Sequence, residues 1–403
     1  MNLQAEFRFA RGEVKIIPKN DIPYIDVKLA LTTICGDIGM PQGVSNDSGF
    51  FMSSSLILAK SSAGLLTPSH SYKPFRYPWA FEFWRKQQQV HWIPEEVPLG
   101  EDCKDWATKL SDSERNLLTQ IFRFFTQSDI EVQDNYLERY GRVFKPTEIK
   151  MMLASFANME TIHIAAYALL LETIGMPESE FGAFMEYEAM RDKHDYMGTF
   201  GVDTEADVCR TLAMFGGFTE GLQLFASFAM LMNFPRFNKM KGMGQIVSWS
   251  VRDESLHCEG IIKLYHAFNR ETKAVTKSVA DDIIDCCKTV VTMEDKFIDL
   301  SFEQGPVQGM TPEDIKAYIR YIADWRLKQL ELPQIYGGAR ENPLPWLQVL
   351  LSGVEHANFF EARATEYSKA ATKGQWTGDE GVWGAFDQLL KKRSEATKGN
   401  IPA

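Results

Sequence analysis

The four-residue pattern Glu-x-x-His occurs twice in the chain, as Glu160-Thr161-Ile162-His163 and as Glu254-Ser255-Leu256-His257. Residues three apart on a helix lie one above the other on the same face, so each pair can direct two side chains at one buried ion. A single pair arises often by chance on a solvated helix face. Two pairs, each inside a long apolar helical stretch, predict a shared metal centre.

A centre of this kind needs further carboxylates, and the sequence offers two. Glu220 interrupts an almost entirely apolar stretch, where an ionised carboxylate is costly unless a cation binds it. Asp129 follows a strongly apolar turn, and Glu131 and Asp134 on the same stretch are weaker candidates. The predicted metal ligands are Asp129, Glu160, His163, Glu220, Glu254 and His257.

Four carboxylates and two imidazoles favour redox-active iron or manganese. Zinc prefers a closed set of four nitrogen and sulfur ligands, and calcium does not favour histidine. We expect two metal ions, as an Fe/Fe pair, and the same ligands accept Mn/Fe or Mn/Mn. Such a centre leaves iron storage, an oxygenase or oxidase, a desaturase and a radical generator open as functions.

Tyr167 lies four residues after His163 and seven after Glu160, on the same helix face and within about one turn of the metals. It is either an ordinary core tyrosine or a phenol that the metal centre oxidises to a radical, and periodicity alone leaves both open. Leu224 and Phe228 follow Glu220 at helical spacing and are candidates for the walls of an apolar pocket around the Tyr167 phenol.

Long helices must carry these residues. Helical stretches separated by glycine and proline turns, with few alternating strand patterns, predict an all-α, ferritin-like helical bundle with a dimetal-carboxylate core. The expected helical stretches are 106–140, 147–174, 178–196, 204–232, 240–269, 279–304 and 311–331.

Composition bounds the class of protein. A net charge of −11 argues against a nucleic-acid partner, and no stretch approaches the ~20 apolar residues of a membrane span. The six cysteines form no C-x-x-C pair, which is typical of reduced thiols and predicts a cytoplasmic protein. The chain divides into three expected regions. We expect residues 1–70 to be a poorly ordered extension with one or two short strands, such as Glu13–Ile17 and Ile25–Val27. Residues 71–370 are expected to form the helical domain, and residues 371–403 are expected to form a flexible tail.

These motifs together resemble the small, radical-generating subunit of class I ribonucleotide reductase, from about Tyr72 to Phe386. The resemblance rests on Ser128-Asp129, Met159–His163 with Tyr167, Thr219-Glu220-Gly221, Val251–His257 and Trp92-Ile93-Pro94-Glu95-Glu96.

The resemblance implies that dioxygen reacts at the dimetal site to form a stable radical on Tyr167. A large catalytic subunit would receive the radical and reduce ribonucleotides to deoxyribonucleotides. The implied transfer route runs through His163, its partner Asp253 and Trp92, an aromatic residue near the surface. A carboxylate partner is also what a metal-bound imidazole usually requires.

The resemblance also assigns roles to the C-terminus. Tyr367 matches the relay tyrosine, and Trp383-Gly384-Ala385-Phe386 matches the segment that docks on the large subunit. Residues 387–403 extend past the point where the family typically stops. A homodimer is implied as well. An oxidase is expected to lack Tyr367 and the docking tail, and an iron-storage bundle is usually much shorter and assembles as a cage.

Overall fold

The computed structural model describes residues 5–10, 13–18, 64–338 and 341–350. The chain divides into two units, Met1–Ser62 and Ala63–Ala403. In the first unit, β1 (Ala5–Ala10) and β2 (Glu13–Pro18) form an antiparallel hairpin in which Ala10 pairs with Glu13. The strand predicted at Glu13–Ile17 is therefore present, and Ile25–Val27 lies outside the described residues.

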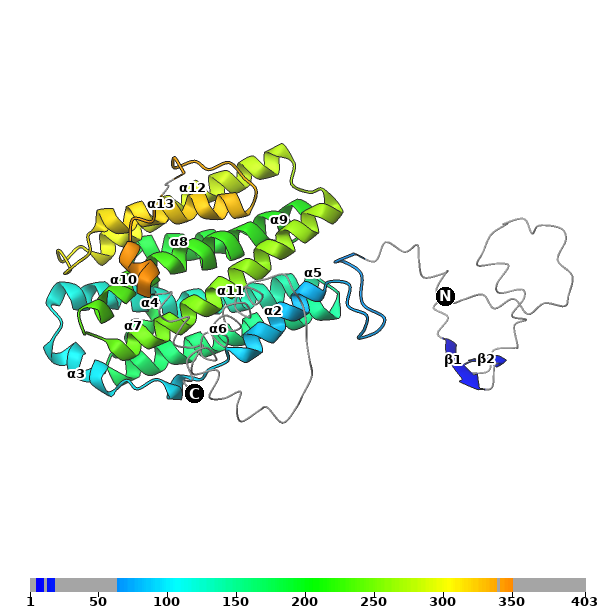
Figure 1. The fold of residues 1–403 in the computed structure, drawn as a ribbon, viewed down its shortest axis with the longest axis horizontal. Coiled ribbons are helices and arrows are strands. Elements are labelled where there is room, and N and C mark those ends of the chain that lie inside the picture. The colour runs from blue at the N-terminus through cyan, green and yellow to red at the C-terminus, as the bar shows by residue number, and fades with distance from the viewer. Residues whose placement is uncertain (1–4, 11–12, 19–63, 339–340, 351–403) are drawn as a thin grey trace, which may run out of the picture. The chain divides into compact units, whose positions relative to one another are not determined.

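The second unit is a bundle of long helices (Figure 1). Its longer helices are α2 (Pro78–Gln89), α3 (Gly100–Thr108), α4 (Asp112–Asp134), α6 (Thr147–Thr173), α8 (Glu188–Gly198), α9 (Glu205–Leu212), α10 (Leu224–Arg236), α11 (Lys241–Thr272), α12 (Lys277–Ser301) and α13 (Pro312–Gln329). Its shorter segments are η2 (Pro94–Glu96), the π-helix η3 (Asn135–Tyr140), α5 (Gly141–Val143), α7 (Ser179–Gly182), η4 (Ala183–Glu186) and the π-helix η5 (Ala213–Gln223).

Most predicted helical stretches are present, but the ends predicted at residues 140 and 232 are wrong. The chain stays helical through Gly141, and α10 continues through Pro235 to Arg236. Pro235 lacks the N–H that would bond the carbonyl four residues back, so it weakens the last turn, and α10 ends one residue later. Residues 64–70 also pack on the bundle, since Leu65 is buried and its N–H donates to Glu271.

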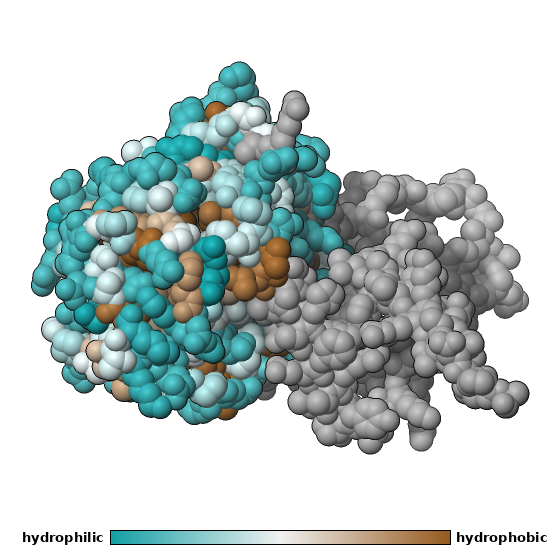
Figure 2. Space-filling model, turned by 60° about the vertical axis from the view of Figure 1, so that its left-hand side comes forward, coloured by the Kyte–Doolittle hydropathy of each residue, from teal (hydrophilic) through white to brown (hydrophobic). Residues whose placement is uncertain are grey.

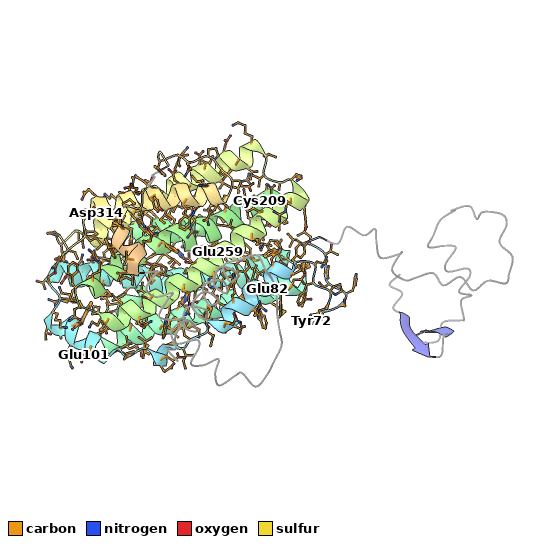
Figure 3. The ribbon with its side chains drawn as sticks, viewed as in Figure 1. Tyr72, Glu82, Glu101, Cys209, Glu259 and Asp314 are labelled. Carbon is orange, nitrogen blue, oxygen red and sulfur yellow. The ribbon has the colours of Figure 1, made fainter. Side chains whose placement is uncertain are left out.

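Local sequence determines where several helices begin. Ser111 with Glu114, Thr204 with Asp207 and Thr311 with Asp314 form reciprocal capping boxes at α4, α9 and α13. Acidic side chains in the first turns, such as Glu101 of α3 and Asp314 of α13, stabilise these helices because they interact favourably with the positive end of the helix dipole (Figure 3).

Helix α11, which carries the second Glu-x-x-His pair, has an unusual start. Met240 adopts a left-handed conformation with φ of 50°, and the buried carboxylate of Asp102 accepts the N–H groups of Gly242 and Met243, both at 2.8 Å. A Cβ at Gly242 would lie 2.7 Å from Asp102 Oδ2, so only glycine allows this approach. These contacts anchor α11 on α3 and fix its position along the bundle.

Close packing also brings α11 against α6. A Cβ at Gly260 would lie 2.8 Å from the ring of Phe156, so the missing side chain lets the two central helices approach. The surface seen in Figure 2 is mostly hydrophilic, with scattered hydrophobic residues, as the net charge of −11 leads one to expect. None of the helices in the described ranges has the length and hydrophobicity needed to span a bilayer.

Candidate metal centre

The structure brings all six predicted ligands together inside the bundle. Side-chain atoms of Glu160, Glu220, Glu254 and His257 lie within 4.8 Å of one another, and those of Asp129, Glu160 and His163 form a second group with the same limit. Glu160 belongs to both groups. Every one of the six is at most 2% exposed. Two adjoining groups that share one carboxylate form a site for two ions.

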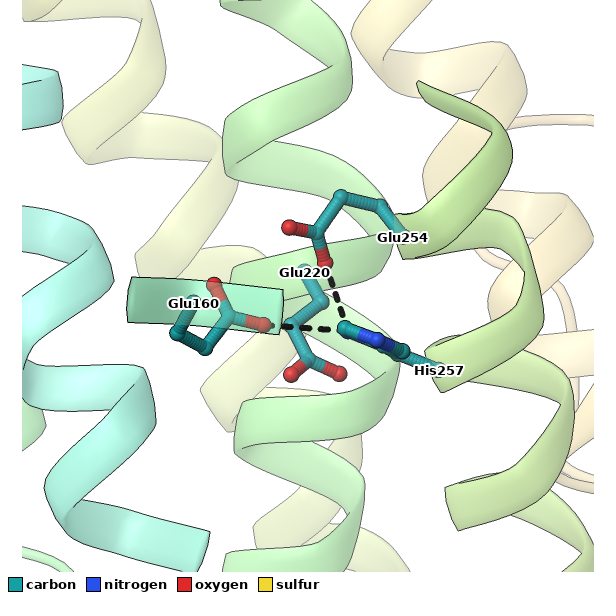
Figure 4. Close-up of side chains that lie close together, drawn as sticks. All are labelled: Glu160, Glu220, Glu254 and His257. Atoms are coloured by element: carbon teal, nitrogen blue, oxygen red, sulfur yellow. Dashed lines mark ion pairs between the residues drawn. The ribbon is translucent and has the colours of Figure 1, made fainter. Parts of the chain in front are cut away.

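The six ligands come from four elements of the bundle. Asp129 lies on α4, the first Glu-x-x-His pair on α6, Glu220 on η5 and the second pair on α11. Figure 4 shows Glu160, Glu220 and Glu254 around the imidazole of His257, with ion pairs from His257 to Glu160 and Glu254. The weaker candidates lie elsewhere: Asp134 is exposed, and Glu131 pairs with His194.

In both imidazoles, a hydrogen bond at Nε2 turns the Nδ1 atom toward the carboxylates of the site. The Nε2–H of His257 donates to Gln87 Oε1 at 3.2 Å, because an amide oxygen can only accept. The Nε2–H of His163 donates to Asp253 Oδ2 at 3.4 Å. Each Nδ1 therefore faces carboxylates: that of His257 lies 3.0 Å from Glu160 Oε1, and that of His163 lies 3.2 Å from Glu254 Oε1.

These distances fit ligands of a shared cation. Two ligand atoms at right angles, each roughly 2.1 Å from one ion, are separated by about 3 Å. Buried oxygens of Asp129, Glu160, Glu220 and Glu254 find no hydrogen-bond donor among the described residues. Buried polar atoms without partners are costly, and four carboxylates in one apolar interior repel each other. A pair of cations removes both penalties, so the donor set fits a dimetal site.

The pKa values show the same electrostatic strain. Burial raises the pKa of Glu220 well above its ordinary value, and the carboxylates of Glu254 and Glu160 add to the shift. Burial also raises the pKa of Asp129, and Glu160 adds to it. Burial lowers the pKa of His257, but the carboxylates of Glu160 and Glu254 outweigh it and raise the value to about 10. In the metal-free protein, protons therefore take the place of the cations.

Tyr167 lies where the sequence places it, one turn beyond His163 and 1% exposed. Its ring packs edge-on against Phe125, at 4.9 Å between centroids, and Phe125 in turn packs against Phe228. The phenol O–H donates to Ser250 Oγ across 3.4 Å. Burial raises the pKa of Tyr167, and the Asp129 carboxylate adds to the shift, so the phenol stays protonated.

Asp253 and Trp92 form a hydrogen-bonded connection to the metal centre. The indole Nε1–H of Trp92 donates to Asp253 Oδ2 at 2.8 Å, the same oxygen that accepts from His163. Trp92 is only 2% exposed, so in the single chain it is buried and not at the surface, although the adjacent Ile93 is 42% exposed. The ring of Trp249 lies 5.0 Å from that of Trp92.

Sequence reasoning missed two residues of this site. Gln87, on α2, accepts from His257 and donates to Asp253 Oδ1 at 3.3 Å, so it connects the second imidazole to the Asp253 carboxylate. Tyr136, on η3, donates its O–H to Glu220 Oε1 at 2.5 Å. The sequence offers only a weak signal for either residue, because Gln87 lies five residues before Trp92 and Tyr136 lies seven residues after Asp129.

Comparison with known proteins places the chain in a family. A model of the family described as "Ribonucleotide reductase, small chain" matches residues 69–343, which is more than half of the chain. The chain belongs to the ribonucleotide reductase small-chain family. The oxidoreductase prediction is therefore confirmed, and neither an oxidase nor an iron-storage bundle is favoured.

Relatives of the small-chain family align over most of the chain. The "Probable ribonucleoside-diphosphate reductase small subunit 376L" of Invertebrate iridescent virus 6 is 40% identical over 78% of this chain and 98% of its own length. The "Ribonucleoside-diphosphate reductase subunit beta" of Chlamydia pneumoniae is 28% identical, over 74% of this chain and 89% of its own.

Solved structures confirm the fold. The "Ribonucleotide reductase R2 subunit from Clostridium botulinum" aligns with a TM-score of 0.65 at 22% identity, over 70% of this chain and 91% of its own. The dimanganese(II)-NrdF of Streptococcus sanguinis aligns with a TM-score of 0.60 at 18% identity, over 68% and 95%. The predicted all-α, ferritin-like bundle is confirmed.

Proposed function

We propose that this chain binds two metal ions, generates a stable radical on Tyr167 and passes it to a large subunit that reduces ribonucleoside diphosphates. The observation that carries the proposal is the convergence of four carboxylates with two imidazoles whose Nδ1 atoms face them. The substrate class follows the names of the relatives.

The proposed ligands are the six residues predicted from the sequence. Asp129, Glu160 and His163 would hold one ion, and Glu160, Glu220, Glu254 and His257 the other. A redox-active metal pair that reacts with dioxygen supplies the oxidising equivalent when bound. We propose Fe/Fe, and Mn/Fe and Mn/Mn remain the alternatives that the ligands accept.

The chain's own residues protect the radical. Tyr167 is buried and packs against the ring of Phe125, and this burial excludes water and soluble reductants from the phenol oxygen. Losing an electron makes a phenol strongly acidic, so oxidation also requires a proton acceptor nearby. Asp129 is the carboxylate whose charge acts most strongly on Tyr167. We assign that role to Asp129, which belongs to the same ligand group as His163.

We propose that the radical leaves along the hydrogen bonds from His163 through Asp253 to Trp92. The distances of 3.4 and 2.8 Å keep the three side chains connected without a gap. Tyr367 and the docking segment Trp383–Phe386 lie outside the described residues and remain predictions. The large subunit is the partner that the family implies, and the cytoplasmic location also remains a prediction.

A homodimer requires an exposed face suited to a second copy, and α6 offers one. Its exposed residues are Lys150, Ala154, Asn158, Thr161, Ala165 and Glu172, and the four between the charged ends are uncharged. These four residues recur at helical spacing as one uncharged stripe along the middle of a central helix, which is unusual for a face in contact with water. We propose this stripe as part of the contact between copies.

Reconstitution with a large subunit tests the function. We expect the metal-loaded chain to support reduction of a ribonucleoside diphosphate, and Tyr167→Phe and Trp92→Phe to abolish it while both variants still bind two metal ions. An exposed aromatic substitution, Tyr72→Phe, serves as the control. Full reduction by the Tyr167→Phe variant would refute the proposal.

A further inference from the structure

Arg326, on α13, is a buried arginine with an unusual set of partners. It is 3% exposed, and no carboxylate among the described residues forms an ion pair with it. Its Nε–H donates to the backbone carbonyl of Gly221 at 2.9 Å, and its Nη1 donates to Gln329 Oε1 at 2.8 Å. A guanidinium is always charged, so burying one without an anion is costly and calls for a specific role.

The carbonyl that Arg326 binds belongs to the residue after Glu220, inside the π-helix η5. There the N–H of Leu224 bonds the carbonyl of Thr219, five residues back. The five-residue ladder returns here to the four-residue ladder of α10, so the backbone bonding is irregular in the turn that carries Glu220. The carbonyl to which Arg326 donates lies in this irregular turn.

Gly221 and Arg326 fit each other sterically. A Cβ at Gly221 would lie 2.6 Å from Arg326 Nε and 3.1 Å from its Cδ. Only glycine therefore lets the guanidinium reach this carbonyl. The guanidinium carbon also lies over the ring of Phe225 on α10, at 5.1 Å from the ring centre, and this cation–π contact helps to hold it beside η5.

Glu220 itself has few other restraints. Its Oε1 accepts from Tyr136, whereas Oε2 has no hydrogen-bond partner among the described residues. Its direction is therefore set by Tyr136 and by the backbone turn. We propose that Arg326 is a positioning residue that holds this turn through the Gly221 carbonyl and so fixes how Glu220 approaches the metal ion. This inference rests on the proposed dimetal site.

Binding of Mn(II) alone to the metal-free full chain tests it. Titration followed by the paramagnetic resonance signal of free Mn(II) reports both sites without any activity. In Arg326→Met we expect the site that contains Glu220 to weaken by roughly 10–100-fold, as is usual for residues that orient ligands. The site of Asp129 and His163 should keep its affinity, and Arg326→Lys should recover part of the loss, because it retains a donor.

Arg320→Met is the matched control, because Arg320 lies on the same helix but pairs with Asp295 and is 37% exposed. If Arg326→Met does not fold, Gly221→Ala should give the same selective loss, because its Cβ displaces the guanidinium. Equal weakening of both sites would show a merely structural role and overturn the inference. Unchanged binding in Arg326→Met, with two ions bound by the wild type, would overturn the inference alone. A wild type that binds no Mn(II) would refute the dimetal site as well.

Discussion

Asp253→Asn is expected to destabilise the metal-free protein, because every partner of this carboxylate is a donor. Trp92 donates at 2.8 Å, Gln87 and Arg252 at 3.3 Å and His163 at 3.4 Å. The amide of asparagine keeps one acceptor oxygen and turns its NH₂ group toward another donor. The substitution changes one oxygen to nitrogen and adds little volume, so packing is preserved.

The magnitude follows from these contacts. A hydrogen bond to a charged group contributes about 1.5–3 kcal/mol, and a buried donor left without an acceptor costs about 1–3 kcal/mol. The bond from Trp92 is short and buried, those from Gln87 and His163 are long, and that from Arg252 is partly screened by solvent. We therefore expect the free energy of unfolding to fall by about 3 kcal/mol at pH 7.

The pH dependence of the stability difference provides a second, independent test of the reasoning. Burial raises the pKa of Asp253, but the hydrogen bond from His163 and the charge of Arg252 outweigh it, so the folded pKa lies below 3.8. A carboxylate with a depressed folded pKa stabilises the protein above its unfolded pKa and loses that effect as the pH falls through the folded value. The difference between Asp253→Asn and the wild type should therefore be full at pH 7 and smaller at pH 3.5.

Urea unfolding of the metal-free protein at both pH values, followed by circular dichroism, measures the effect. Asp134→Asn, an exposed carboxylate on α4, is the matched control and should change stability by less than ~0.5 kcal/mol. A variant as stable as the wild type at pH 7, or a difference that grows at pH 3.5, would refute the reasoning.

Three further predictions concern the buried charges and the exposed stripe of α6. Lys193→Met should lower the free energy of unfolding by about 3–5 kcal/mol, because it leaves Glu294, 2.6 Å from Lys193 Nζ, unpaired in the core. Adding Glu294→Leu should recover most of this loss, and urea unfolding that shows no recovery would contradict the prediction. Metal affinity should rise with pH up to about 10, by about tenfold per pH unit for each proton displaced. The reason is that the pKa values of His257 and His163 are raised, so a metal ion must displace a proton from each imidazole. A metal affinity that does not change between pH 6 and 8 in a chelator-competition titration would contradict this prediction. Ala165→Glu should shift the protein to a monomer in sedimentation velocity, and an unchanged dimer would exclude the stripe from the contact.

The sequence was sufficient for the parts of the site that depend on local periodicity. Residues three or four apart on a regular helix share a face, so the spacing alone places Glu160, His163 and Tyr167 on one face of α6, and Glu254 and His257 on one face of α11. Glu220 could be found because an isolated carboxylate in an apolar stretch needs a reason to be there. Asp253 came from the family resemblance, and the need of a metal-bound imidazole for a partner at its other N–H agrees with it.

The missed residues depend on long-range packing and on irregular helix geometry. Gln87 reaches His257 across 170 positions of sequence, and no local pattern connects them. The π-helices η3 and η5 change the number of residues per turn, so extrapolation at 3.6 residues per turn fails for Tyr136 and for the surroundings of Glu220. Arg326 belongs to the same class, because its partner is a backbone carbonyl that carries no side-chain signal.

The central claim is that a metal pair held by these six residues produces a radical on Tyr167. Electron paramagnetic resonance, combined with metal analysis, tests it most directly on the chain alone, after metal-free protein is given ferrous iron, or ferrous iron with manganese, and then oxygen. We predict about two metal ions per chain and a tyrosyl signal that is absent from Tyr167→Phe, whose metal content stays unchanged. A protein that binds two ions yet shows neither a radical nor a high-valent metal state under any loading, or a tyrosyl signal that persists in Tyr167→Phe, would contradict the claim.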